Sequence, residues 1–193
     1  DELIRRFSGS VDGIIYHTVQ FCDNYAYEYA WLKSWMKRPL LLLETDYTRQ
    51  SYGQILTRIE AFLESLQPEV QRIQRQTKGE NAMYVLGIDS GSTSTNAVIM
   101  DRDRKIKAFS VVRTGAKSGV SAQKALDEVL QRAGLTREDI SWIVSTGYGR
   151  VSIEFADENV TEISCHGKGA HYFNPKIRTI LDIGGQDSKA IHL

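Results

Sequence analysis

One stretch of the chain, residues 84–100, decides the fold. It reads Tyr84-Val85-Leu86-Gly87-Ile88-Asp89-Ser90-Gly91-Ser92-Thr93-Ser94-Thr95-Asn96-Ala97-Val98-Ile99-Met100. An apolar strand ends at Asp89, a turn of glycine and hydroxyl residues follows, and a second apolar strand returns, which is the layout of a tight β-hairpin. Such a turn presents backbone N–H groups to a phosphate, and glycine lets the backbone approach an anion closely. The stretch therefore predicts a phosphate-binding hairpin, with an ordinary glycine hairpin as the alternative.

A second stretch repeats this plan about ninety residues later. Residues 179–191 read Thr179-Ile180-Leu181-Asp182-Ile183-Gly184-Gly185-Gln186-Asp187-Ser188-Lys189-Ala190-Ile191. Two related hairpins favour two related lobes that grip the phosphates of one nucleotide from opposite sides. The chain contains neither the Walker phosphate loop nor the glycine fingerprint of dinucleotide-binding folds.

Four segments, 86–95, 146–150, 162–170 and 182–187, carry a resemblance to a known family. Together they resemble the ATP-dependent activators of 2-hydroxyacyl-CoA dehydratases and their benzoyl-CoA reductase relatives, ATPases of the BadF/BadG/BcrA/BcrD type. These belong to the superfamily of acetate and sugar kinases, actin and heat-shock chaperones. The resemblance implies an α/β fold for residues 83–193, with a ribonuclease-H-like, actin- or chaperone-type ATPase lobe and the first hairpin of a truncated second lobe.

The resemblance also implies ATP and Mg²⁺ as ligands and assigns roles to the two hairpins. Asp89 would hold magnesium through water, and Asp89, Asp182 and Asp187 are the candidate catalytic residues. The sequence does not rank Asp182 against Asp187 for orienting water or metal. Attack of water on the γ-phosphate needs charge neutralisation and a positioned water rather than covalent chemistry. The residues expected to clasp the phosphates are Ser90, Gly91, Ser92, Thr93, Gly184, Gly185 and Gln186.

Residues 1–68 have a different pattern and are expected to form a separate α/β fragment. Helical spacing at residues 1–7, 25–36 and 55–66 alternates with short apolar runs at 13–16 and 40–43, which indicates helices packed on a parallel sheet. The polar residues 69–82 are predicted to be a linker. Residues 12–15, 20–23 and 43–47 resemble the C-terminal part of a dehydratase subunit.

In that subunit the cysteine matching Cys22 is one ligand of an iron–sulfur cluster. A lone cysteine cannot hold such a cluster, which takes three or four thiolates. From chemistry alone, Cys22 is better described as a half-buried small hydrophobe. Cys22 is thus a candidate metal ligand by resemblance only.

Within residues 83–193, the pattern predicts further elements around the hairpins. We expect an exposed edge strand at 106–112, a helix at 122–133 capped by Gly134, and a strand at 140–144 that delivers residues 145–150 to the ligand edge. Arg150, which follows a turn, is interpreted as solvated. Cys165 and His166 are adjacent, would point apart on a strand, and are interpreted as structural or as a loop near the nucleotide.

Composition narrows the function further. The chain has 193 residues, with 24 basic and 24 acidic side chains, so it lacks the positive field that draws in nucleic acid. The longest apolar run, residues 39–43, is too short to span a bilayer, and the first residues show no signal-peptide pattern. Two cysteines suit a reducing compartment. We therefore expect a cytoplasmic protein that binds neither nucleic acid nor membranes.

The resemblance implies the activator component that uses ATP hydrolysis to drive a low-potential electron into a 2-hydroxyacyl-CoA dehydratase or a benzoyl-CoA-reductase-like enzyme. Its partners would be dehydratase subunits and a second copy of itself, with one iron–sulfur cluster at the homodimer interface, through a segment that this chain lacks. Two alternatives remain: a nucleotide-binding or interaction fragment without turnover, and a small-molecule kinase of the same superfamily. Whether this chain alone is an enzyme is left open.

Overall fold

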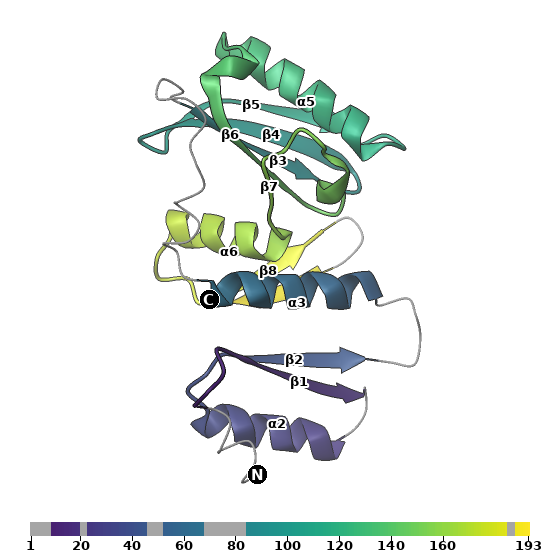
Figure 1. Ribbon diagram of the computed structural model, residues 1–193, viewed down its shortest axis with the longest axis vertical. Coiled ribbons are helices and arrows are strands. Elements are labelled where there is room, and N and C mark those ends of the chain that lie inside the picture. Colours follow the sequence, from purple (N-terminus) through teal and green to yellow (C-terminus); the bar gives the residue numbers. More distant parts are fainter. Residues whose placement is uncertain (1–8, 20–22, 46–51, 68–83, 185–187) are drawn as a thin grey trace. The chain divides into compact units, whose positions relative to one another are not determined.

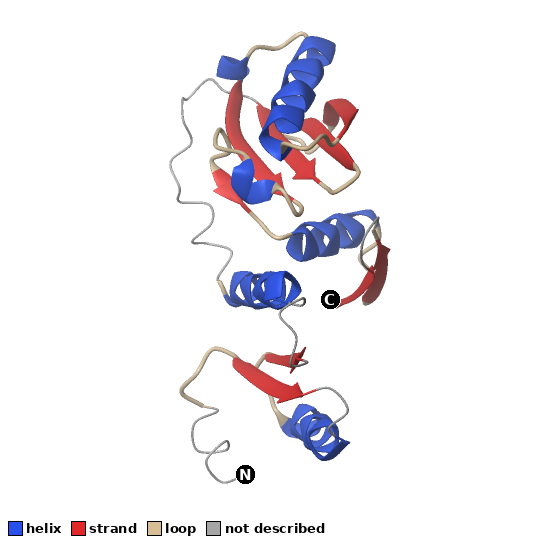
Figure 2. Ribbon diagram, turned by 90° about the vertical axis from the view of Figure 1, so that its right-hand side faces the viewer, coloured by secondary structure: helices blue, strands red, loops and turns tan. Residues whose placement is uncertain are grey.

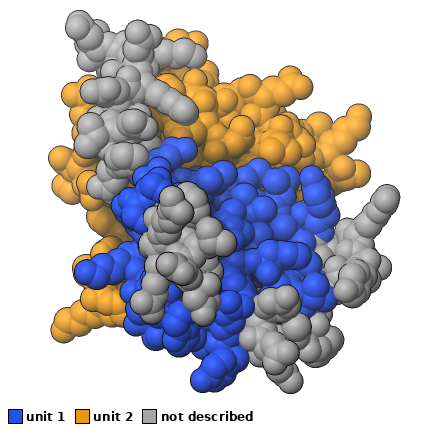
Figure 3. All heavy atoms as spheres, turned by 60° about the horizontal axis from the view of Figure 1, so that its bottom comes forward, with its two compact units in different colours: residues 1–69 blue, residues 70–193 orange. Residues whose placement is uncertain are grey.

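The computed structural model describes residues 9–19, 23–45, 52–67, 84–184 and 188–193. The chain divides into two compact units, residues 1–69 and residues 70–193, which are coloured separately in Figure 3. The helix expected at residues 1–7, the linker expected at 69–82, Cys22 and residues 185–187 lie outside the described ranges.

The first unit is a small parallel α/β arrangement, as the sequence predicts. Its elements are β1 (Ile14–Val19), α2 (Asp23–Trp35), β2 (Leu40–Thr45) and α3 (Tyr52–Leu66). The two strands pair in parallel, with Ile14 opposite Leu40. A Cβ on Gly13 would lie 2.7 Å from the Phe62 ring, so α3 packs tightly against the start of β1. Leu32 and Leu43 are buried in this unit.

The second unit is built on a five-stranded sheet (Figure 1). Its strands are β3 (Tyr84–Ser90), β4 (Ser94–Asp101), β5 (Ile106–Arg113), β6 (Ile140–Thr146) and β7 (Glu158–Asn159). The order is β5-β4-β3-β6-β7, in which β3, β4 and β5 form an antiparallel meander and β6 and β7 run parallel to β3. This is the arrangement expected of a ribonuclease-H-like lobe, and β5 is the edge strand that Lys105 and Lys107 indicate.

Helix α5 (Ser118–Ala133) covers one face of this sheet (Figure 2). Its apolar residues recur at the spacing of one helical face. The helix ends at Gly134, whose φ of 66° lies in the left-handed region that favours glycine, as predicted. The Ser110 hydroxyl donates to the Ala125 carbonyl at 2.7 Å and ties β5 to the helix. The core between helix and sheet includes Leu86, Ile88, Ile99, Ala122, Val129 and Ile143.

Beyond β7 the chain forms α6 (Glu162–Phe173) and an antiparallel hairpin of β8 (Thr179–Ile183) and β9 (Ser188–His192). Helix α6 begins after Thr161, whose side chain accepts the Ser164 N–H at 3.4 Å. A Cβ on Gly167 would lie 3.1 Å from Leu193, so the helix and the end of the hairpin approach closely there. The loop alternative for Cys165 and His166 is wrong, because both residues lie on α6.

Candidate functional site

The turn of the first hairpin is closed by its own backbone and braced by Thr114. The Gly91 N–H donates to the Ser94 carbonyl at 3.0 Å. Thr114, which follows β5, donates its hydroxyl to the Gly91 carbonyl at 2.8 Å and its N–H to the Thr93 carbonyl at 3.0 Å. Ser92 and Thr93 are exposed, whereas the Ser90 side chain is fully buried on the face that α5 covers. The accessible hydroxyls of this turn therefore come from Ser92 and Thr93.

Asp89 lies on the other face of the sheet, at the end of β3. Its neighbour in register on β6 is Thr146. Burial raises the pKa of the Asp89 carboxyl above its ordinary value, the His166 charge opposes this, and Glu162 and Asp182 add to it. A carboxylate that has lost part of its water and faces other carboxylates is stabilised by a bound cation.

The loop after β6 packs against Asp89 and Ser90 through two glycines. Gly147 has a φ of 85°, and a Cβ there would clash with the Asp89 carboxylate and lie 2.7 Å from the Ser90 carbonyl oxygen. The Gly149 N–H donates to that carbonyl at 2.9 Å, and a Cβ on Gly149 would lie 2.7 Å from the Ser118 Cβ. A side chain at position 147 would therefore displace the Asp89 carboxylate, and one at position 149 would displace Ser90 or Ser118.

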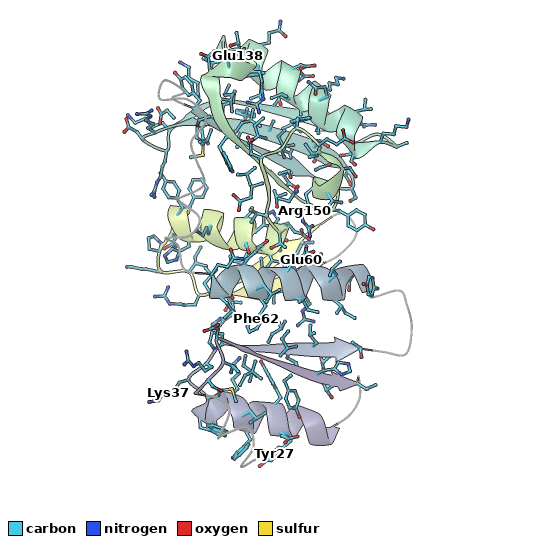
Figure 4. All side chains as sticks on the ribbon, viewed as in Figure 1. Tyr27, Lys37, Glu60, Phe62, Glu138 and Arg150 are labelled. Carbon is cyan, nitrogen blue, oxygen red and sulfur yellow. The ribbon has the colours of Figure 1, made fainter. Side chains whose placement is uncertain are left out.

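Arg150 is buried, so the interpretation of this side chain as solvated is wrong. Only 8% of the residue is exposed. Its Nη1 donates to the Gly147 carbonyl at 3.1 Å and lies 3.5 Å from a carboxylate oxygen of Glu162, the first residue of α6. Figure 4 shows Arg150 on the side of the sheet toward α6. A buried guanidinium needs such a partner, and the sequence alone did not reveal that Glu162 supplies it.

The second hairpin carries Asp182 on β8 directly opposite Lys189 on β9. One oxygen of Asp182 lies 2.9 Å from His166 Nδ1 and 3.9 Å from Lys189 Nζ. The same Lys189 nitrogen donates to Glu162 at 3.2 Å. Gly184 is exposed at the end of β8, whereas Gly185, Gln186 and Asp187 lie outside the described residues. The structure therefore brings Asp182 together with His166, Lys189 and Glu162, none of which the sequence singles out as a candidate site residue.

If residues 162–173 are predicted to be a helix, two of these side chains are also predicted to lie close together. Glu162 and His166 are four residues apart, a spacing that places them on one face of α6. No comparable local signal exists for Lys189, which reaches Glu162 from 27 residues away in the sequence.

The described residues fit a magnesium ion better than an iron–sulfur cluster. Among them, no group of three or more His, Cys, Asp or Glu side chains is arranged to hold a metal. Magnesium bound with a nucleotide needs only one or two carboxylates, because water and phosphate supply its other ligands, and Asp89 satisfies that need. The Thr146 hydroxyl, on the strand beside Asp89, is buried with no hydrogen-bond partner in the described structure. A cluster takes three or four thiolates, and the described ranges contain only Cys165.

Comparison with known proteins assigns the chain to a family. The model of the BadF/BadG/BcrA/BcrD ATPase family matches residues 86–193, which include both hairpins, the glycine loop and α6. The chain belongs to this family. A second model, of the D-component of 2-hydroxyglutaryl-CoA dehydratase, matches residues 1–66.

Similar members of the family are activator proteins by name. An activator of lactoyl-CoA dehydratase from Anaerotignum propionicum is 51% identical over 111 residues, which are 58% of this chain and 42% of that protein. The crystal structure of (R)-2-hydroxyglutaryl-CoA dehydratase component A from Acidaminococcus fermentans is 41% identical, with a TM-score of 0.54 over 57% of this chain and 43% of that one. The 2-hydroxyisocaproyl-CoA dehydratase activator from Clostridium difficile with bound ADPNP is 40% identical, with a TM-score of 0.55 over 57% and 41%. The chain thus spans about two fifths of these relatives.

An uncharacterised protein from Methanocaldococcus jannaschii extends the match toward the N-terminus. It is 36% identical over 159 residues, which are 77% of this chain and 35% of that protein. This alignment is longer than residues 70–193, so it reaches into the first unit. No helix within the described part of the chain is long and apolar enough to cross a membrane.

Proposed function

We propose that the two hairpins of this chain bind the phosphates of Mg·ATP. The observation that carries the proposal is the convergence of Asp89, at the end of β3, with the Asp182 hairpin on one cluster of charges, beside Gly147, where an added Cβ would meet the Asp89 carboxylate. The family to which the chain belongs and the ADPNP bound to one relative support this proposal.

In this proposal, Asp89 holds Mg²⁺ through water, and the groups of residues 90–93 and 184–186 clasp the phosphates. Asp182 and Asp187 orient the attacking water or the metal. The water oxygen attacks the γ-phosphorus in line, the bond from phosphorus to the β,γ-bridging oxygen breaks, and ADP and phosphate form. The ion supplies positive charge for the phosphate oxygens. The protein's contribution is the position of its carboxylates and amides.

The parent protein is proposed to be an ATPase activator that drives electron transfer to a 2-hydroxyacyl-CoA dehydratase or a benzoyl-CoA-reductase-like partner, in the cytoplasm and as a homodimer. The names of the relatives and the match of residues 1–66 to a dehydratase component support this class of partner. Since the described residues do not fit an iron–sulfur cluster, no electron-transfer step is assigned to them.

Calorimetry on the full chain tests this proposal. Mg·ATP is titrated into the wild type, the Asp89→Ala variant and a matched control, Asp127→Ala, which changes an exposed carboxylate on α5. We expect binding by the wild type and the control, and at least a tenfold loss of affinity in Asp89→Ala or without magnesium. Equal affinities with and without Asp89 would refute the assignment. Phosphate release, measured in parallel, separates an ATPase from a binding module without turnover.

A further inference from the structure

Four charged side chains of alternating sign, together with His166, form a continuous chain in the second unit. Arg150 Nη1 lies 3.5 Å from Glu162, Glu162 lies 3.2 Å from Lys189 Nζ, Lys189 lies 3.9 Å from Asp182, and Asp182 lies 2.9 Å from His166. Three of these four contacts join residues that are 12 to 27 positions apart in the sequence, and the fourth joins Lys189 and Asp182, which face each other across the hairpin. Such pairs are stronger than exposed ones, because these side chains are largely shielded from water.

This charge chain connects the surroundings of Asp89 with the second hairpin. Arg150 also donates to the Gly147 carbonyl, and Gly147 is the residue that packs against the Asp89 carboxylate. On the second hairpin, Asp182 joins the chain through Lys189 and His166. Lys189 occupies the middle, with 21% of its side chain exposed, and is shared by Glu162 and Asp182.

Lys189 is not the main anchor of the hairpin. Ile191, two residues further along β9 and on the same face, is buried, and both Ile191 and Leu193 approach α6 at Gly167. These apolar contacts hold the hairpin on the helix. The lysine adds a cation between two carboxylates that would otherwise repel each other in a partly desolvated site.

We propose that Lys189 is a positioning residue that holds the Asp182 carboxylate in place for the phosphates of Mg·ATP. This inference rests on the proposed function. Without the ammonium group, Asp182 keeps His166 as a partner but loses the cation that separates it from Glu162, so the carboxylate moves. A displacement of about 1 Å in such a site costs up to about a hundredfold in rate or binding.

A double-mutant cycle on the full chain distinguishes positioning from general stabilisation. Mg·ATP affinity is measured for the wild type, Lys189→Met, Asp182→Asn and the double variant, with Lys176→Met as the control for removing an exposed lysine from the same half of the unit. We expect roughly a tenfold loss in Lys189→Met and no further loss when that change is added to Asp182→Asn, because Lys189 acts through Asp182. Lys189→Arg should recover most of the affinity, and Lys176→Met should bind as the wild type does.

The outcomes separate this inference from the proposed function. If the wild type binds and Lys189→Met binds equally well, or if its loss persists undiminished in Asp182→Asn, the positioning role is wrong while nucleotide binding stands. If the wild type itself does not bind Mg·ATP, both proposals fail. If Lys189→Met does not fold, the same comparison is made in the Glu162→Gln background. In that background, removal of the lysine leaves only the Asp182 carboxylate without the ammonium group.

Discussion

The two hairpins share one sequence plan but are supported differently. In β3–β4 the strands lie inside a five-stranded sheet, and Leu86, Ile88 and Ile99 are buried beneath α5. Among the described residues, β8 and β9 pair only with each other, Leu181 and Ile183 are 77% and 80% exposed, and Ile191 is buried. Packing and backbone contacts fix the first aspartate, whereas charged side chains fix the second. The same motif therefore tolerates different substitutions in its two copies.

The largest effect is expected from Gly147→Ala, which breaks the support of the first hairpin. The new Cβ would meet the Asp89 carboxylate and the Ser90 carbonyl, and φ would remain at 85°. We expect a loss of about 4 kcal/mol in the stability of the second unit and the loss of Mg·ATP binding. Native-state hydrogen exchange of the β3 amides measures the stability.

The matched control for this variant is Gly134→Ala. Gly134 also has a positive φ, of 66°, but nothing lies within 4 Å of an added Cβ. The Gly134→Ala substitution should lower the free energy of unfolding by only about 1 kcal/mol and leave nucleotide binding intact. Equal losses of stability in Gly147→Ala and Gly134→Ala would show that the close approach of Gly147 to Asp89 does not add to the cost of the substitution.

A comparison of two apolar truncations tests the difference in packing. Ile99→Ala removes a fully buried side chain from β4 and should cost about 3 kcal/mol. Leu181→Ala removes an exposed side chain from β8 and should change stability by less than about 0.5 kcal/mol. Urea unfolding followed by hydrogen exchange in each hairpin measures both effects. Similar costs would mean that the second hairpin is packed in solution.

Salt should distinguish the hairpins further. Raising the ionic strength to about 1 M shortens the Debye length to about 3 Å and weakens the partly exposed ion pairs of Lys189. Amide exchange in β8–β9 should accelerate about two- to fivefold, while exchange in β3–β4 should not change. The Lys189→Met variant serves as the control, because its exchange should respond less to salt. If salt accelerated amide exchange equally in both hairpins, ion pairs would not be more important for β8–β9 than for β3–β4.

The smallest effect is expected on thermal stability, from replacing the partly buried, ionised Asp89 carboxylate. Its pKa is raised above 3.8 in the folded chain, mainly by burial, so the folded state binds the proton more tightly than the unfolded state does. Stability is therefore lost as the pH rises from 3.8 through the folded pKa. Without nucleotide, Asp89→Asn should raise Tm by roughly 1 to 3 °C at pH 7, and the difference should shrink toward pH 4. A wild type that melts higher than the variant at pH 7 would disprove this.

The sequence predicts the first lobe well because its signals are local. Two apolar runs on either side of a glycine turn mark β3 and β4, and the apolar stripe and Gly134 mark α5 and its end. Helix α6 was missed because it contains two glycines, Gly167 and Gly169, which lower helix propensity, and only a weak apolar stripe. Without α6, the burial of Arg150 and the contacts of Lys189 could not be predicted either, because Glu162 on this helix is the partner of both residues. These pairings depend on tertiary contacts, for which a single sequence carries no periodic signal.

The length of helix α6 determines how far its two ends would move if the helix rotated. It starts at Glu162, three residues after β7 ends, and its 12 residues give it a length of about 18 Å. Turning the helix by about 10° at Thr161 would carry its far end through about 3 Å, by simple proportion to that length. The charged contacts of Glu162 lie at the pivot, where displacement is small, whereas Phe173 lies at the tip. Such a rotation would therefore displace the end of the helix that leads into β8 far more than it displaces Glu162.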